Sequence, residues 1–235
     1  MVLLDRFHNS KRFDLIEKTT ITCKALDEVL RGEGLTDIDF IKLDTQGSEL
    51  AILEGATSIL TESVFGLEIE VEFAELYQGQ PLFSDVDSFV RKYGFDLINL
   101  RMSSWKRTVG ETVGNEKGQL IFADALYFRQ PLQVIDNLKS LDRRLARSKL
   151  LRAISICQIY GFFDYGLELL DLAASNLFDT SEIIQLQTHL RTQAPRAGWL
   201  PNFPGRKRSA DFFARLPRWL TPWSHKFKQR HLGNH

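Results

Sequence analysis

Between residues 19 and 128 the chain alternates short apolar runs with segments of helical periodicity, and this alternation constrains the fold more than any other feature. The runs are rich in β-branched and aromatic residues, and we expect strands at residues 19–23, 38–43, 65–73, 95–100 and 120–128. Strands that alternate with helices predict a mostly parallel sheet covered by helices. The last connection has no helical segment, so the final strand is expected to run antiparallel.

The segments between these strands carry helix signals. Residues 26–30 are expected to form a short helix that ends near Gly32. Ser48 is predicted to cap a second helix through its hydroxyl group. Ser84, followed by Asp87 three residues later, resembles the capping box that would begin a third helix.

After Pro131 the strand signal disappears. Residues 131–195 show helical periodicity only, and 153–170 resembles one helix-turn-helix unit of the tetratricopeptide kind. One unit cannot form a solenoid, so we expect a plain bundle packed on an α/β domain over residues 1–130. Residues 196–235 form a third part, with nine basic residues, one acid and interleaved aromatic residues. This tail is either solvated and partly disordered or a weak binding segment for a membrane surface or an anionic partner.

Composition narrows the class of protein. Thirty basic and thirty acidic residues give a formal net charge of zero, which argues against a dedicated nucleic-acid binder. Cys23 and Cys157 lie far apart with no zinc-ligand spacing, so we expect a reduced, cytoplasmic location. No apolar run approaches the length of a transmembrane segment, and residues 1–12 lack the pattern of a secretory signal.

A series of collinear words then points to a family. The segment IDFIKLDTQGSE occupies residues 38–49. It is accompanied in order by ALDE at 25–28, LEGA at 53–56, EIEVEF at 68–73, LYQGQPLF at 76–83 and GQLIF at 118–122. Over residues 1–130 the chain resembles the FkbM-type S-adenosylmethionine-dependent methyltransferases.

This resemblance implies a partial class I methyltransferase sheet, which is Rossmann-like, with the five expected strands as the third to the seventh. The family's glycine-rich cofactor turn follows its first strand, and nothing before Thr19 matches that turn. The resemblance therefore implies the acceptor side of the site and S-adenosylmethionine as cofactor, with weak or no binding of that cofactor by this chain alone.

Asp44 is the first candidate catalytic residue because it ends a strand and precedes a glycine turn into a helix. Ligands of open α/β sheets bind beyond the carboxyl ends of the strands, and a base there can accept a hydroxyl proton. The alternative is that Asp44 only caps the following helix. On the family template Gln46 and Gly47 are candidate cofactor contacts. So is Asp27, near the expected adenine position, although a helix-start role is equally open.

Three acids, Glu68, Glu70 and Glu72, point to one side of their strand because side chains alternate with a period of two. We expect Glu68 and Glu70 on a solvated or salt-bridged face, with Lys42 as the partner of Glu70. Glu72 lies nearest the carboxyl end and is the second candidate catalytic residue. Acceptor or metal contact is open for it, and no metal ligand is assigned.

Two further residues are candidate acceptor contacts. Glu49 lies in the first turn of the helix after Gly47, where it can contact the acceptor or stabilise the helix dipole. Trp105 is expected in the loop between the last two strands, together with Lys106 and Arg107, either beside an acceptor pocket or in solvent.

Two functions follow from these observations. The first is an O-methyltransferase acting on a hydroxyl of a small molecule, a sugar or a lipid. The second is a non-catalytic remnant or protein-interaction module. The family template also predicts the sheet order 38–43, 65–73, 120–128, 95–100. Strand 38–43 then lies at an edge, where unpaired backbone groups would permit self-association.

Overall fold

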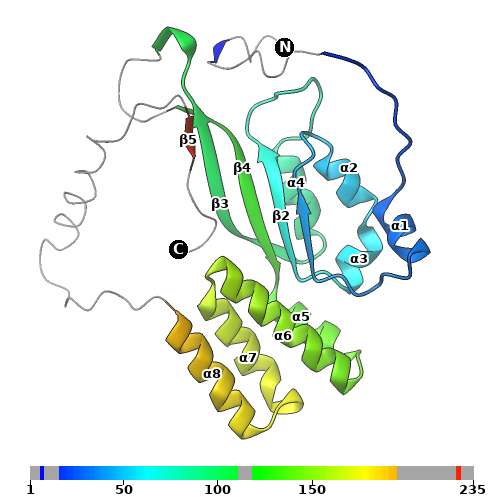
Figure 1. Cartoon of the computed structure of the whole chain (residues 1–235), viewed down its shortest axis with the longest axis vertical. Helices are drawn as coiled ribbons and strands as arrows, with labels where there is room; N and C mark the ends of the chain where they lie inside the picture. The colour runs from blue at the N-terminus through cyan, green and yellow to red at the C-terminus, as the bar shows by residue number, and fades with distance from the viewer. Residues whose placement is uncertain (1–5, 8–15, 111–117, 195–225, 229–235) are drawn as a thin grey trace, which may run out of the picture.

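The computed structural model describes residues 6–7, 16–110, 118–194 and 226–228. Its fold is mixed α/β, with a sheet and short helices followed by a helical bundle (Figure 1). In chain order the elements are α1 (Leu26–Gly32), β1 (Phe40–Leu43), α2 (Glu49–Glu54), α3 (Thr57–Glu62), β2 (Gly66–Glu72), α4 (Phe83–Arg91), β3 (Phe95–Trp105), a 3-10 turn (Thr108–Gly110), β4 (Gln119–Arg129), α5 (Pro131–Lys139), α6 (Arg143–Tyr160), α7 (Phe163–Leu177), α8 (Thr180–Gln193) and β5 (Lys226–Lys228).

The sheet has the order β1-β2-β4-β3-β5. The predicted order of the first four strands is therefore confirmed. β1 and β2 pair in parallel, whereas β4 runs antiparallel to both of its neighbours, so β1, β2 and β3 share one direction. β5 pairs antiparallel with β3 at the far edge and was not predicted from the sequence.

Strand β1 lies at the other edge, as the family template predicted, because β2 is its one neighbour within the described residues. The expected strand at residues 19–23 is wrong. Those residues belong to no strand and are exposed. β-branched residues favour extended backbone, but a strand also requires a neighbouring strand and a packed face, and residues 19–23 have neither.

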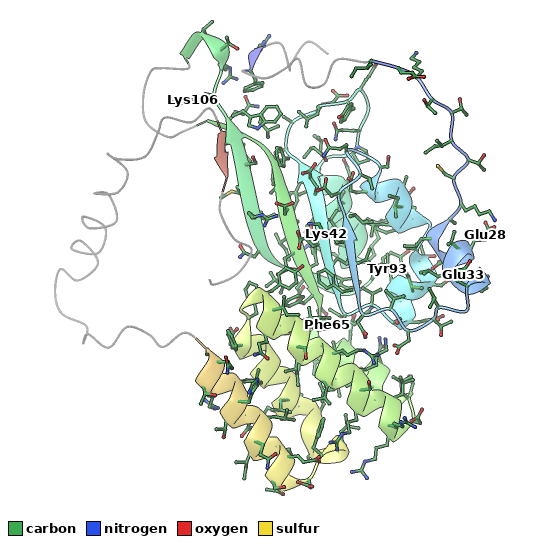
Figure 2. The ribbon with its side chains drawn as sticks, viewed as in Figure 1. Glu28, Glu33, Lys42, Phe65, Tyr93 and Lys106 are labelled. Atoms are coloured by element: carbon green, nitrogen blue, oxygen red, sulfur yellow. The ribbon has the colours of Figure 1, made fainter. Side chains whose placement is uncertain are left out.

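Opposite faces of the sheet pack against different groups of helices. One face carries Leu67, Ile69 and Val71 of β2 and forms one core with helices α1–α4. The other face meets the helices α5–α8 at its lower end, where Phe65 and Phe128 enter a second core. Figure 2 shows Phe65 at this junction.

The helix starts differ from the predicted ones in detail. Asp85, not Ser84 with Asp87, closes the start of α4, since its carboxylate accepts the N–H of Leu82 at 2.9 Å. Asp87 instead pairs with Arg91 one turn later, at 2.8 Å. The predicted helix-turn-helix unit is present as α6 and α7, joined at Gly161 with φ of 82°. A positive φ of this size favours glycine at a helix end.

Charged groups hold the bundle to the sheet domain. Lys149 of α6 lies 2.6 Å from Asp37 and 3.2 Å from Asp39, and Arg152 pairs with the same two acids. On the sheet side, the buried Arg129 donates to backbone carbonyls of α3, of residue 64 and of residue 93. The bundle is thus fixed at the end of the sheet where β1 and β2 begin (Figure 1).

The expectations for residues 1–18 and for the basic tail at residues 196–235 concern segments that lie mostly outside the described residues. Among the described helices, none is both long enough and apolar enough to cross a bilayer.

Candidate functional site

The candidate site lies where β1 and β2 end, at the end of the sheet opposite the bundle (Figure 1). Because β1 and β2 are parallel neighbours, the segments that follow them leave the sheet side by side. Residues 44–48 follow β1, and residues 73–82 follow β2. In open α/β sheets this is the position at which ligands bind.

The loop after β1 is shaped by two left-handed residues and one buried carboxylate. Gln46 has φ of 60° and Gly47 has φ of 111°. A positive φ is uncommon for a residue with a side chain and is often retained at functional sites. The carboxylate of Glu49 accepts the N–H groups of Thr45 and Gly47 at 2.6 and 2.8 Å and the Thr45 hydroxyl at 2.9 Å. The prediction for Ser48 is wrong, since its side chain makes no capping hydrogen bond.

The turn after β2 is organised in a similar way by Gln80. Its Oε1 accepts the N–H groups of Leu76 and Tyr77 at 2.8 and 2.6 Å. The two turns also touch each other. A Cβ atom on Gly47 would lie 3.5 Å from Nε2 of Gln80 and 3.6 Å from the ring of Tyr77. Gln80 is therefore held beside the glycine turn.

The three acids of β2 share one face, as predicted, but all three are buried. The expected solvated alternative for Glu68 and Glu70 is therefore wrong. Lys42, labelled in Figure 2, pairs with Glu68 at 2.5 Å, whereas the sequence predicted Glu70 as its partner. The sequence correctly predicted that Lys42 lies on the same face of the sheet as the acids of β2, but the strand register places it directly opposite Glu68. Glu70 accepts a hydrogen bond of 2.5 Å from the Gln46 amide.

Glu72 has the most unusual environment of the three acids. It is 3% exposed, and its Oε1 has no hydrogen-bond partner among the described residues. Burial and, to a smaller extent, the negative charges of Glu49 and Glu70 together raise the pKa of Glu72 to about 8, although a hydrogen bond from the Gln80 amide opposes part of the increase. A carboxyl group with a pKa near the working pH can take and return a proton.

The other candidate acids are placed differently. Asp44 is exposed at the end of β1, and its carboxylate accepts a long hydrogen bond, 3.3 Å, from Gln46. Asp27 lies in the first turn of α1, away from this cluster. Its carboxylate accepts the N–H groups of Ser58 and Ile59 at 2.7 and 3.2 Å. Asp27 thus stabilises the start of α3.

Trp105 is not in a loop as predicted, because β3 extends to include it. It is 3% exposed and packs edge-on against Phe7 and Phe122. The longer strand arises because this end of β3 pairs with Gln119 of β4. Lys106 follows it and is buried, whereas Arg107 is exposed. Figure 2 shows Lys106 at the upper end of β3.

The sequence did not single out Gln80 as a site residue. The word LYQGQPLF contained it, but glutamine has no titratable group that would draw attention to it. Its contact with Gly47 and its place near Glu72 became visible only with the packing of the two turns. Among the described residues there is no group of three His, Cys, Asp or Glu side chains that could hold a metal ion.

A comparison with known protein families finds a match in this chain. Residues 4–97 match the family model of the methyltransferase FkbM domain. The resemblance predicted from the sequence is confirmed over that range. The matched segment contains α1 to α4 and the two turns that form the candidate site described above. No curated protein and no solved structure matches the chain.

Proposed function

We propose that this chain carries the acceptor side of an S-adenosylmethionine-dependent methyltransferase that methylates a hydroxyl group of a small molecule, a sugar or a lipid. The FkbM match supports methyl transfer as the class of reaction. The observation that carries the proposal is Glu72, a buried carboxyl with an unpartnered oxygen and a pKa near 8. On this proposal the sheet is the acceptor-side part of a class I methyltransferase sheet, in a cytoplasmic protein.

The site suits the positive sulfonium end of S-adenosylmethionine, which would supply the methyl group. Glu49 and Glu70 place negative charge at the ends of β1 and β2, close to Glu72, whose Oε1 atom has no hydrogen-bond partner within the described part of the chain. Gln46 and Gly47, which the resemblance assigns to the cofactor, lie in the same turn. Asp27 fits such a role less well, because both of its carboxylate oxygens bind the start of α3.

Glu72 would act as the general base. The acceptor oxygen forms a bond to the methyl carbon, the bond between that carbon and sulfur breaks, and the hydroxyl proton passes to the Glu72 carboxylate. Only the ionised form of Glu72 can accept that proton. Turnover should therefore rise with pH and level off above the pKa of Glu72, about 8. Asp44 is the second candidate for this role.

The test is transfer of a labelled methyl group from millimolar S-adenosylmethionine to a panel of small-molecule, sugar and lipid hydroxyls. Glu72→Gln should lower turnover by about a hundred- to ten-thousand-fold, because it removes the base. Gln78→Glu is the matched control, since residue 78 is exposed on the same turn. Absence of transfer to every class of acceptor would contradict the proposal.

One observation favours the second candidate, a non-catalytic interaction module. The edge of β1 has no neighbouring strand within the described residues. An open edge can pair with a second chain. Sedimentation of the chain over a range of concentrations tests this. A dimer that is lost when Lys42 is replaced by proline would support it, because the backbone carbonyl of Asp39 binds the β2 side and the backbone of Lys42, three residues later, faces the open edge, where proline removes a ladder donor.

A further inference from the structure

Arg129, the last residue of β4, is a buried cation that the candidate site does not use. It is 4% exposed, and its guanidinium donates to the backbone carbonyl groups of Val64 at 2.9 Å, Tyr93 at 3.1 Å and Leu60. Burial lowers the pKa of Arg129 to about 10, and no acid among the described residues opposes this effect. A buried cation without an acidic partner is costly, so an anion that reached Arg129 would be bound favourably.

The three carbonyl groups hold the guanidinium in place without using all of its donors. A guanidinium has five N–H groups, one on Nε and two on each terminal nitrogen. Each nitrogen gives one hydrogen bond to a carbonyl oxygen, so each terminal nitrogen of Arg129 keeps a second N–H group. A guanidinium with two such groups can bind two oxygens of a phosphate or a carboxylate.

Two cavities at the junction of the sheet domain and the bundle are lined by Arg129. The smaller one has a volume of about 30 Å³, which suits water. The larger one, the junction cleft, has a volume of about 380 Å³, which lies in the range of small-molecule sites. The junction cleft is lined by Thr61 of α3, by Lys92, Tyr93 and Arg129 around the end of α4 and of β4, and by Gln133, Asp136 and Asn137 of α5. Tyr93 is labelled in Figure 2.

The charges of the junction cleft favour an anion. Lys92 is exposed and adds a second positive charge beside Arg129. Asp136 is the one acid among the described residues that line the cleft. Its charge is already compensated, because Lys139 lies 2.9 Å from its carboxylate. The cleft therefore offers two cations to a ligand and carries a positive net charge.

Uncharged polar groups complete the lining. The side chains of Gln133 and Asn137 end in amides, each of which can donate and accept hydrogen bonds. Such groups suit the hydroxyl groups of a polyol or a sugar. We propose that the junction cleft binds the phosphate ester of a hydroxyl-bearing small molecule, with Arg129 and Lys92 on the phosphate group and with Gln133 and Asn137 on the hydroxyl groups.

This site is separate from the candidate methyltransferase site. Arg129 pairs with Phe95 at the start of β3, whereas the candidate site lies where β1 and β2 end. The inference therefore does not depend on the proposed function. Because α3, β4 and α5 all contribute to the cleft, a bound ligand would also hold the bundle to the sheet domain.

The experiment is calorimetric titration of the full chain with glucose 6-phosphate, inorganic phosphate and glucose, at about pH 7.5 and at one ionic strength set with chloride. We expect saturable binding of glucose 6-phosphate. Inorganic phosphate should bind at least about tenfold more weakly, because it leaves the two amides without partners, and glucose should show no measurable binding. Glucose 6-phosphate should also raise the midpoint of thermal unfolding, since it binds the folded chain.

Two variants test the residues. Lys92→Met should lower the affinity for glucose 6-phosphate by about tenfold or more, with little effect on folding, because Lys92 is exposed. Lys24→Met is the matched control, since it removes the same charge from a side chain that is 63% exposed and lies before α1. Asn137→Asp keeps the size of its side chain but places a negative charge in the cleft, and it should lose binding altogether.

Four results would overturn the inference. They are the absence of saturable binding of glucose 6-phosphate, glucose binding as tight as that of its phosphate ester, inorganic phosphate binding as tight as that of the ester, or normal affinity in Lys92→Met and Asn137→Asp. The third result would mean that the cleft takes the free anion and that the amides contribute nothing. The comparison of the three probes uses the wild-type chain, so it does not depend on how a variant folds.

Discussion

The ammonium nitrogen of Lys42 lies 2.5 Å from a carboxylate oxygen of Glu68, its direct partner on the neighbouring strand. The Tyr160 hydroxyl, at the end of α6, donates to the other oxygen of Glu68 at 2.6 Å. Arg101 of β3 approaches Glu68 at 3.8 Å and binds Asp124 of β4 at 2.7 Å. One buried carboxylate thus links the sheet to the bundle, and its charge is compensated from both sides.

This arrangement predicts unequal effects from its two members. Glu68→Gln should lower the free energy of unfolding by about 3 kcal/mol, because it leaves Arg101 and Lys42 without their shared counter-charge. Lys42→Met should cost about 0–1 kcal/mol, since the Lys42 side chain is 52% exposed and its charge is screened by water. Urea unfolding of both variants measures the difference. Equal losses would show that the ion pair, and not the buried carboxylate, dominates.

The raised pKa of Glu72 predicts how stability depends on pH. Its value in the folded chain, about 8, lies above the ordinary value of 4.5. The folded state therefore holds this proton more tightly than the unfolded state does. The contribution to stability is full below about pH 4.5 and is lost as the pH rises through about 8, by an amount on the order of 5 kcal/mol.

Glu72→Gln provides the comparison, because glutamine resembles the neutral acid and does not titrate. Urea midpoints measured at about pH 5 and pH 9 should differ more for the wild-type chain than for this variant. Subtracting the change in midpoint of the variant from that of the wild-type chain isolates the effect of Glu72 from those of the other titrating groups. Identical changes in midpoint would contradict the raised pKa.

Asp44 offers a test of its two interpretations. Asp44→Asn should lower methyl-transfer turnover strongly if this carboxylate is the base or orients it, by up to about a hundred- to ten-thousand-fold. Folding should change little, because Asp44 is exposed and accepts a long hydrogen bond from Gln46. Thermal unfolding checks that point. Near-normal turnover would reduce Asp44 to a local contact of the turn and leave Glu72 as the base.

The sequence predicted the sheet well, because strand identity and order depend on long patterns and on family words. The order of the first four strands and the edge position of β1 both followed from them. Details that depend on partners were missed. Residues 19–23 have strand propensity but no neighbouring strand. Lys42 pairs with Glu68 because the backbone register of β1 and β2 places these two residues opposite each other.

The candidate site shows the same division. The family words at 38–49 and 76–83 lie far apart in the sequence, and the structure brings their turns together at the ends of β1 and β2. The sequence could not show that Glu49 would turn inward to bind its own loop. Nor could it show that Gln80 would lie against Gly47, since both depend on how two turns far apart in sequence pack together.

The bundle is attached through a cluster of charges that should weaken in acid. Burial acts to raise the pKa of Asp37, but hydrogen bonds and charges from Lys149 and Arg152 outweigh it and hold this pKa below its ordinary value of 3.8. Asp39 binds the same two basic side chains. Because the pKa of Asp37 is depressed in the folded chain, its contribution is present above 3.8 and is lost as the pH falls through the depressed value.

Lys149→Met tests whether this cluster holds the bundle in place. Lys149 is 13% exposed and binds Asp37, Asp39 and Ser63, so its loss should cost about 1–3 kcal/mol of unfolding free energy. Lys139→Met is the matched control. Its pair with Asp136 is exposed on both sides, so its loss should cost no more than about 0.5 kcal/mol. Urea unfolding gives both values, and limited proteolysis between β4 and α5 reports detachment of the bundle. If the Lys149 variant is as stable and as resistant to cleavage as the control, the apolar contacts around Phe65 and Phe128 hold the bundle without the charges.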